Sequence, residues 1–202
     1  MASCETGRDV LQVLYKQGQN TSSVSKAKAR ITSHSSGLRY AQPLNSSVSS
    51  QTMKTRKAEI ADVAGVAELV RGLSFYYSEN GQDELPEWFR ATITNSAFAD
   101  RFDDPEYFNF VAEIHGSIVG YVSVKTGFHL YHLFVSSSFH NQGIAKSLWQ
   151  HCVGQLNIEQ CTVRSSIYAI PVYSKLGFTI SGDRACKDGI GFQLMFYNSA
   201  SC

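Results

Sequence analysis

From Met53 onward, the spacing of apolar residues predicts the elements of one folded domain. Residues 54–60 alternate weakly and predict a first strand. Asp62 is a predicted N-cap for a helix with apolar residues at helical spacing, namely Val63, Val66, Ala67 and Val70. Residues 73–101 are predicted to be helical in pieces, and Pro86 begins the piece that contains Trp88, Phe89 and Ile93. The domain therefore opens with a β-α unit followed by more helix.

Strand patterns dominate residues 108–197 and are interrupted by two helices. Residues 108–114 and 117–124 flank the turn residues His115 and Gly116 and predict a hairpin, and residues 128–135 predict a third strand. After a polar link, one helical face is predicted from Ile144, Leu148, Cys152, Val153 and Leu156. A strand at 161–164, a helix at 167–175 closed by Gly177, and a last strand at 191–197 complete the order β-α-α-β-β-β-α-β-α-β. This order predicts an α/β (α+β) fold with a mixed sheet.

Residues 1–52 have a different composition from the rest. They hold eleven serines, two tyrosines and neither Phe nor Trp, so they bury too little apolar surface to offset the entropy of ordering. Six basic residues outnumber two acidic ones there. We expect a disordered or dispensable extension before an N-terminal domain boundary at Met53, which is itself a candidate start. The alternative is a basic interaction arm that would make the chain a tail-directed interaction protein.

Charge and length exclude several classes of partner. The 202 residues carry a net charge of +1, so no broad field favours nucleic acid or an anionic membrane. No run approaches the roughly 18 apolar residues of a membrane helix, and the first thirty residues lack the apolar region of a signal peptide. We expect a cytoplasmic protein that binds neither nucleic acid nor membrane. Its five cysteines have no metal-ligand spacing, and we expect Cys152 and Cys161 to be small core residues.

The segment 133–149 carries the clearest chemical signal. An apolar strand and a polar loop lead to Gly143 and Ala145, which open an amphipathic helix. The unpaired N–H groups of a helix's first turn attract anions, and small residues let a phosphate approach the backbone. Lys146 adds a positive charge. The segment predicts a phosphate site, with an ordinary strand-to-helix turn as the alternative, and its spacing is neither GxGxxG nor a P-loop.

Two signatures in this chain resemble those of the GNAT superfamily of acyl-CoA N-acyltransferases. The run 140–145, HNQGIA, resembles Arg/Gln-x-x-Gly-x-Gly/Ala, with His140 where Arg or Gln is usual. The run 169–178, AIPVYSKLGF, resembles A-x-x-x-Y-x-K-x-G-F position for position. The resemblance covers residues 53–197 and implies a mixed, mostly antiparallel sheet flanked by helices. It also implies an N-acetyltransferase that needs no metal. Family members often dimerise, and the sequence leaves the oligomeric state open.

The resemblance also implies how acetyl-CoA, the co-substrate, would be held. The pantetheine arm would pair with the strand that ends at Leu133, Phe134 and Val135, where this strand separates from its neighbour. The pyrophosphate would lie over the N–H groups of the loop and helix start. The cofactor-binding residues implied there are His140, Asn141, Gln142, Gly143, Ile144, Ala145 and Lys146.

Acetyl transfer to an amine requires an acid for the departing thiolate and a neutral attacking nitrogen. By the resemblance, the acid is Tyr173, whose phenol stays protonated at neutral pH; the alternative is a packing residue. His129 is the candidate base, since some family members carry Glu or His there, and the alternative is a structural histidine. Strand alternation places Tyr131, Leu133 and Val135 with His129 and places Leu130, His132 and Phe134 on the other face. We therefore expect the two histidines to serve different sites.

Substrate selection is predicted to come largely from residues 73–107. Aromatic residues there are interspersed with acidic ones, which suits a cationic amine; they include Tyr76 and Tyr77, and Glu113 on a neighbouring strand is a further candidate. The alternative is a helical cover whose aromatic residues form core. The predicted reaction is direct transfer to a primary amine of a small molecule or protein. The rival function is an acyl-CoA-binding regulatory module that performs no transfer.

Overall fold

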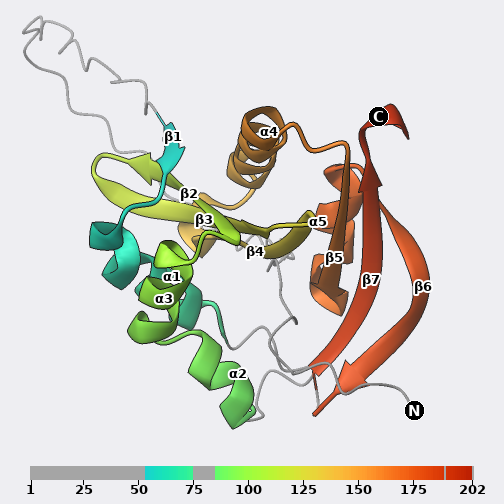
Figure 1. The fold of residues 1–202 in the computed structure, drawn as a ribbon, viewed down its shortest axis with the longest axis horizontal. Coiled ribbons are helices and arrows are strands. Elements are labelled where there is room, and N and C mark those ends of the chain that lie inside the picture. The colour runs from blue at the N-terminus through green and yellow to red at the C-terminus, as the bar shows by residue number, and fades with distance from the viewer. Residues whose placement is uncertain (1–52, 75–84, 189, 202) are drawn as a thin grey trace, which may run out of the picture. The chain divides into compact units, whose positions relative to one another are not determined.

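The computed structural model describes residues 53–74, 85–188 and 190–201, and the predicted extension 1–52 lies outside them. Within these residues the strands are β1 (Lys54–Lys57), β2 (Tyr107–Ile114), β3 (Ser117–Lys125), β4 (His129–Val135), β5 (Gln160–Ser166), β6 (Phe178–Lys187) and β7 (Ile190–Asn198). The α-helices are α1 (Val63–Gly72), α2 (Glu87–Thr92), α3 (Asn95–Asp103), α4 (Ile144–Leu156) and α5 (Ile170–Lys175). Figure 1 shows their arrangement.

One sheet contains all of these strands, in the order β1-β2-β3-β4-β5-β7-β6. Neighbouring strands are antiparallel except β4 and β5, which are parallel. The hairpin between β2 and β3 turns at His115 and Gly116, and both have positive φ, as the right-handed twist of a two-residue hairpin requires. The predicted mixed, mostly antiparallel sheet is confirmed.

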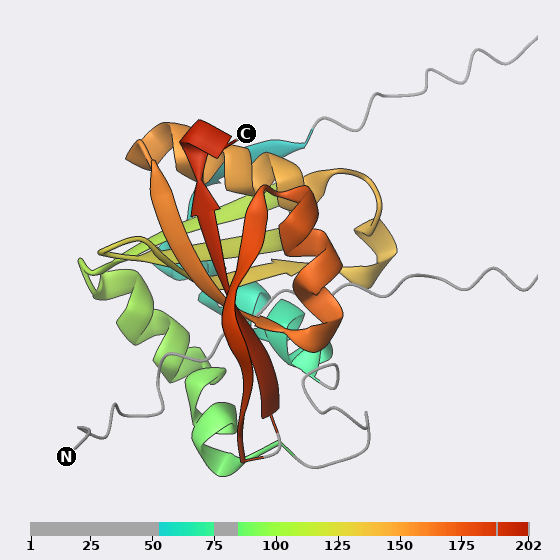
Figure 2. The ribbon, with the colours of Figure 1, turned by 90° about the vertical axis from the view of Figure 1, so that its right-hand side faces the viewer.

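Helices cover both faces of the sheet, and each face has its own core (Figures 1 and 2). On one face α4 and α5 pack over a cluster that includes Leu133, Leu148 and Tyr173. On the other face α1, α2 and α3 pack over a cluster that includes Phe89, Phe98 and Phe134. The sequence pattern predicts both layers, because the apolar faces of α1 and α4 repeat at helical spacing.

Close packing of α4 depends on Gly120 in β3. A Cβ at this position would lie 2.8 Å from Leu148 Cδ1 and 3.1 Å from Ile144 Cγ2. The missing side chain lets the first turns of α4 lie directly against the sheet. The helix start is thereby fixed beside the end of β4, where the phosphate site is predicted.

β4 and β5 separate along their length. They pair only at His129 with Thr162 and at Leu130 with Val163. The amide of Thr162 also donates to the Phe128 carbonyl at 3.0 Å. Beyond Leu130 the described residues of β4 and β5 form no further register pairs, so the two strands diverge there.

The predicted order of elements omits one strand, and this is a correction. Residues 178–187 form β6, which pairs with β7 alone among the described strands. Eight of its ten residues are exposed, and Gly182, with φ +87°, interrupts its pairing near Ile180. An exposed, bulged edge strand has no hydrophobic alternation by which sequence could reveal it. The first strand is also shorter than predicted, since β1 ends at Lys57.

The predicted alternation of side chains along β4 holds from His132 to Val135 but fails before His132, because the strand contains a bulge. Its register with β3 shifts between the pair Ser123–His132 and the pair Val124–Leu130. Tyr131 and His132 consequently lie on the same face, where their rings stack at 4.9 Å. Leu130 joins Leu133 in the core beneath α4. His129 and His132 therefore share a face of the sheet, contrary to the expectation that alternation would separate them.

Candidate active site

The junction between β4 and α4 has the geometry of an anion site. Asn141 and Gly143 both have positive φ, +63° and +79°, and α4 begins directly after Gly143. Its N-cap residue, Gly143, has no side chain that could cap it, and the first backbone bond is donated by Ser147 to the Gly143 carbonyl at 2.9 Å. The N–H groups at the start of α4 therefore have no acceptor within the helix. A Cβ on Gly143 would meet nothing within 4 Å, so the space in front of them is open.

A cavity of about 210 Å³ lies along this junction. It runs from the end of β4 and the start of α4 to α5, and its walls are mainly apolar. Its lining residues are Val135, Phe139, His140, Asn141, Gly143, Ile144, Ala145, Lys146, Pro171, Val172, Lys175 and Leu176. Most of the predicted cofactor-binding residues are thus brought together. Leu133 and Phe134 are fully buried, and the exposed Gln142 turns its amide toward the Ser138 carbonyl at 3.4 Å.

His140 occupies the first position of the signature, and its ring contacts the end of β4. Its Nε2 lies 2.8 Å from the carbonyl oxygen of Val135. This contact closes the short turn between strand and helix, which includes the 3-10 segment Ser137–Phe139. The Val135 carbonyl at the end of β4 therefore already accepts a hydrogen bond from this imidazole.

Tyr173 extends from α5 into the core beneath the sheet. Its ring packs edge-on against Phe178 at 5.3 Å between centroids, and its side chain is fully buried. No group in the described part of the chain forms a hydrogen bond with its hydroxyl. Burial holds the pKa of this hydroxyl well above its ordinary value, and Cys161 contributes in the same direction. A protonated phenol with an unused donor is the form that a general acid requires.

The two histidines of β4 have different surroundings. His129 is half-buried, and its Nδ1 lies 2.8 Å from the Thr162 hydroxyl where β4 and β5 still pair. His132 is fully buried among aromatic rings, including Phe98 at 5.6 Å and Phe134 at 5.2 Å. Burial, with the charge of Arg101 as a second cause, holds the pKa of His132 well below its usual value. His132 is therefore a neutral core residue on the face that also holds Phe134, as the alternation predicts for this pair.

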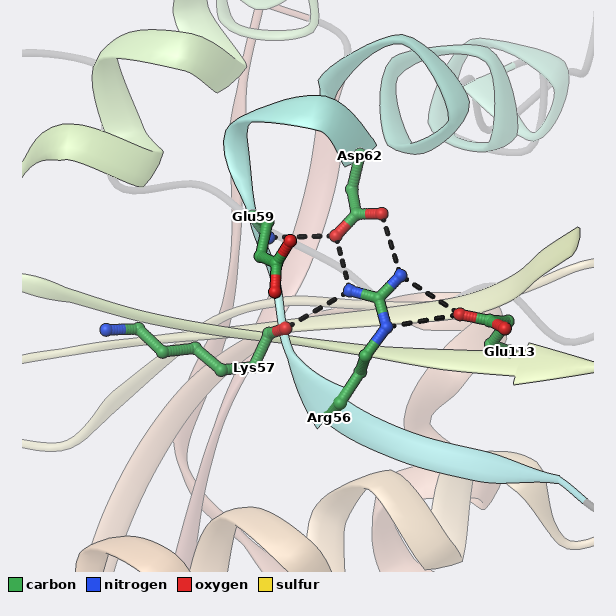
Figure 3. A network of polar contacts seen from close by, with 5 residues as sticks. All are labelled: Arg56, Lys57, Glu59, Asp62 and Glu113. Carbon is green, nitrogen blue, oxygen red and sulfur yellow. Dashed lines mark hydrogen bonds and ion pairs between the residues drawn. The ribbon is translucent and has the colours of Figure 1, made fainter. Parts of the chain in front are cut away.

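Glu113 belongs to a compact ion-pair network (Figure 3). Arg56 donates from Nε and Nη2 to Glu113 Oε2 at 3.1 and 3.0 Å, and from Nη1 and Nη2 to both Asp62 oxygens at 2.7 and 2.9 Å. Asp62, the predicted N-cap of α1, directly precedes that helix. Its carboxylate instead accepts from Arg56 and from the Glu59 amide at 2.8 Å. Glu113 could bind a cationic substrate while sharing its carboxylate with Arg56, whose hydrogen bonds to it use Oε2.

The residues predicted to select the substrate are only partly described. Tyr76 and Tyr77 lie outside the described residues. Phe89 is fully buried in the core beneath α1, α2 and α3, and Trp88 packs against it edge-on at 5.7 Å. Lys187 Nζ lies 4.9 Å from the Trp88 ring, so the end of β6 contacts α2. For Phe89, the core alternative is the one observed.

The two buried cysteines near the site are core residues. Cys152 and Cys161 are free and buried in the core beneath α4, as predicted. Burial raises the pKa of Cys161 to about 12 and raises that of Cys152 further. Both thiols stay protonated at neutral pH and are poor nucleophiles.

Comparison with known protein families identifies the family of this chain. Residues 76–198 match the family model described as an acetyltransferase (GNAT) domain. The chain belongs to the GNAT acetyltransferase family. No curated protein matches the chain at a significant level.

Solved structures share the fold at low sequence identity. A PaiA N-acetyltransferase from Thermoplasma acidophilum, in complex with coenzyme A, is 17% identical, with a TM-score of 0.59 over 73% of this chain and 99% of that chain. A ribosomal-protein alanine N-acetyltransferase from Escherichia coli is 16% identical, with a TM-score of 0.54 over 73% and 94%. A variant spermidine N-acetyltransferase from Vibrio cholerae is 13% identical, with a TM-score of 0.52 over 73% and 94%. At these identities the likeness establishes the fold.

None of the helices in the described ranges has the length and apolarity needed to cross a membrane.

Proposed function

We propose that this chain transfers the acetyl group of acetyl-CoA to a primary amine by direct attack within a ternary complex. One observation carries the proposal: β4 diverges from β5, and its last residue, Val135, lines one cavity together with the start of α4. An extended amide-containing chain ending in phosphates matches both surfaces, because the strand edge offers backbone pairing and the helix start offers N–H groups. The family match adds that the domain is an acetyltransferase.

The residues present fit coenzyme A. Leu133, Phe134 and Val135 lie on the part of β4 that has separated from β5, and they would pair with the pantetheine arm. Asn141 to Lys146 would hold the pyrophosphate through backbone N–H groups, with the open space at Gly143 allowing close approach. A relative of the same fold was solved with coenzyme A. The apolar cavity walls suit the uncharged portion of the arm.

Tyr173 is proposed as the general acid. When bound, acetyl-CoA supplies a thioester whose carbonyl carbon accepts the attacking nitrogen. The Tyr173 hydroxyl then donates its proton to the departing sulfur. Two features support this role: the hydroxyl is fully buried, and no described group uses it as a hydrogen-bond partner. Its raised pKa keeps the proton in place until a thiolate develops.

His129 is proposed as the base that accepts a proton from the attacking amine. Its imidazole lies at the point where β4 and β5 begin to separate, and Nδ1 is oriented by the Thr162 hydroxyl. Histidine's ordinary pKa, near 6.5, suits removal of a proton that becomes acidic as the carbon–nitrogen bond forms. His132 is enclosed by aromatic rings and is not assigned this role.

The acceptor is proposed to be a primary amine of a small molecule or a protein. Relatives of the same fold include one enzyme named for spermidine and one named for a ribosomal-protein alanine. Tyr76, Tyr77 and Glu113 stay the proposed substrate-binding residues. Of these, Glu113 is the one whose surroundings are described, and it would have to share its carboxylate with Arg56.

The test measures thiol release from acetyl-CoA across a panel of amines, beside calorimetric titration of coenzyme A into the full chain. The panel includes polyamines, aminoglycosides and peptides with free N-termini. Turnover with one amine class is expected, and its abolition in His129→Gln with retained coenzyme A affinity would support the base. Binding without turnover on any amine would favour the regulatory module. Absence of binding would overturn the proposed site.

A further inference from the structure

We infer that Arg101 is a positioning residue for the proposed base: its guanidinium holds the bulge of β4, and the bulge determines the face of the sheet on which His129 lies. Arg101 belongs to α3, which packs on the face that α1 and α2 also cover. The inference rests on the proposed function, since it concerns the residue proposed there as the base.

The bulge in β4 reverses the faces of the residues that precede it. The register of β4 with β3 shifts between His132 and Leu130, so Tyr131 is the inserted residue. Uninterrupted alternation from His132 would direct His129 toward α4, because the two residues are an odd number of positions apart. With the inserted residue, His129 lies on the same face as His132, and Leu130 joins the core beneath α4.

The face of His129 matters because the proposed acid lies on the other face. Tyr173 belongs to the core beneath α4 and α5, whereas His129 is directed toward the side of α1, α2 and α3. During transfer a carbon–nitrogen bond forms and a carbon–sulfur bond breaks, so the base takes a proton from nitrogen and the acid gives one to sulfur. Two groups on opposite faces, near the place where β4 and β5 diverge, suit this division. Without the bulge, both groups would lie on one face.

Arg101 contacts the inserted residue directly. Its guanidinium lies over the rings of Phe98 and Tyr131, 4.9 Å from each ring centroid. Nη2 donates to the Thr92 carbonyl at 3.1 Å, which ties the guanidinium to the end of α2. Tyr131 in turn stacks on His132 at 4.9 Å between centroids. The guanidinium therefore connects α2 and α3 to the bulge and keeps the inserted ring on this face of the sheet.

A role in stability alone would not favour arginine at this position. The residue is 7% exposed, its Nη1 is buried without a hydrogen-bond partner, and no carboxylate among the described residues pairs with it. Replacing a buried charged group by an apolar one is often neutral or stabilising. A planar cation is instead suited to holding an aromatic ring in one orientation. Stability and turnover should therefore respond differently when the guanidinium is removed.

The experiment compares Arg101→Met, His129→Gln and the double variant in the full chain, by thiol release from acetyl-CoA with the amine that the panel identifies. Arg101→Met should lower kcat about ten- to a hundredfold and leave the melting temperature unchanged or higher. Its affinity for coenzyme A should stay within about twofold, because residues 132–135 keep their register with β3 beyond the bulge. Arg101→Lys keeps the cation without the planar guanidinium and should recover part of kcat.

The double variant tests whether Arg101 acts through His129. If it does, the two losses overlap, so Arg101→Met should change kcat by less than about twofold once His129→Gln is present. Losses that multiply, or an unchanged kcat in Arg101→Met alone, would overturn the inference and leave the proposed base in place. An unchanged kcat in His129→Gln alone would overturn the proposed base and the inference with it. Absence of turnover by the wild-type chain on every amine would instead overturn the proposed function.

The matched control is Arg71→Met, which removes another arginine that contacts α3. The described hydrogen bonds of Arg71 go to Asn95 Oδ1 at 2.9 Å and to the Ile93 carbonyl at 3.4 Å, and none reaches β4. This variant should lower the melting temperature and leave kcat unchanged. Should Arg101→Met fail to fold, Tyr131→Leu removes the ring beside the guanidinium and should reproduce the loss of kcat and its overlap with His129→Gln. Full kcat in Tyr131→Leu would overturn the inference.

Discussion

Two clusters of polar groups in this protein differ in whether their hydrogen bonds are complete. At the Arg56 network, one guanidinium meets two carboxylates at 2.7–3.1 Å, and the Asp62 carboxylate also accepts from the Glu59 amide. At the β4–α4 junction, the helix start has no side-chain cap and faces open space. The first cluster is closed by its own members, whereas the second leaves donors directed outward.

This difference predicts a structural role for the Arg56 network and a binding role for the β4–α4 junction. Paired charges that bond to one another hold β1, β2 and the start of α1 together. Unsatisfied N–H groups at a helix start gain most from an external anion. Substitutions in the Arg56 network should therefore change stability, and substitutions at the β4–α4 junction should change cofactor affinity. A substitution with the opposite effect would contradict the comparison.

Tyr173→Phe should give the largest effect. Turnover is expected to fall about 10²- to 10³-fold, because the departing thiolate loses its acid. Affinity for coenzyme A should stay within about twofold, and the melting temperature should not fall, since the hydroxyl has no partner among the described groups. Steady-state kinetics, calorimetry and thermal denaturation check these expectations. Unchanged turnover would remove Tyr173 as the acid.

Gly143→Leu should give the next largest effect, on binding. A leucine there would adopt φ near +79° and fill the open space before the helix start. Coenzyme A affinity is expected to fall about ten- to a hundredfold, measured by calorimetry. The matched control is Gly116→Leu at the exposed hairpin turn, which imposes similar backbone strain at a residue that does not line this cavity. Equal losses of affinity in both variants would show that backbone strain, rather than the filled space at Gly143, weakens coenzyme A binding.

Arg56→Met should reduce stability and leave cofactor affinity unchanged. Two carboxylates would lose their shared partner, at a cost of about 1–3 kcal/mol in the free energy of unfolding near pH 7. Hydrogen bonds from Arg56 lower the pKa of Asp62, so the stabilisation is present above pH ~4 and is lost as pH falls further. Urea denaturation at pH 7 and pH 3.5 should show the wild type and variant converging at the lower pH. A difference that grew on acidification would be inconsistent with the network.

Glu113→Gln should have the smallest effect. The amide oxygen can still accept from Arg56, so we expect a loss of about 0.5–1 kcal/mol in stability and kcat/KM within about twofold. A tenfold loss of kcat/KM confined to cationic amines would instead assign Glu113 to the substrate site. Kinetics with a cationic and a weakly basic amine distinguish the two results.

The elements that could be predicted from the sequence are those with local signals, such as apolar residues that recur with a clear period. The apolar faces of α1 and α4 and the hairpin at His115 and Gly116 each have local signals, and each is observed. The start of α4 directly after Gly143 was also predictable, because glycine at a strand-to-helix junction is a local feature. Each of these depends on residues within a few positions of one another.

The features that the sequence did not reveal depend on pairing between distant residues. β6 is an exposed, interrupted edge strand whose only sheet partner is β7, so its own residues show no alternation. The bulge at Tyr131 and His132 arises from register with β3, and a single strand's pattern assumes that no residue is inserted. The contact of His140 with Val135 likewise requires the turn to be known.

The short pairing of β4 with β5 also predicts where the domain opens locally. Two register pairs join the part of the sheet built from β1 to β4 to the part built from β5 to β7. Such a seam is where sub-global opening should begin, with the amide hydrogens on either side exchanging as separate cooperative units. A ligand lying in the seam would act as a temporary strand and couple the two units. Catalytic turnover would then alternate the sheet between a divided state and a continuous one.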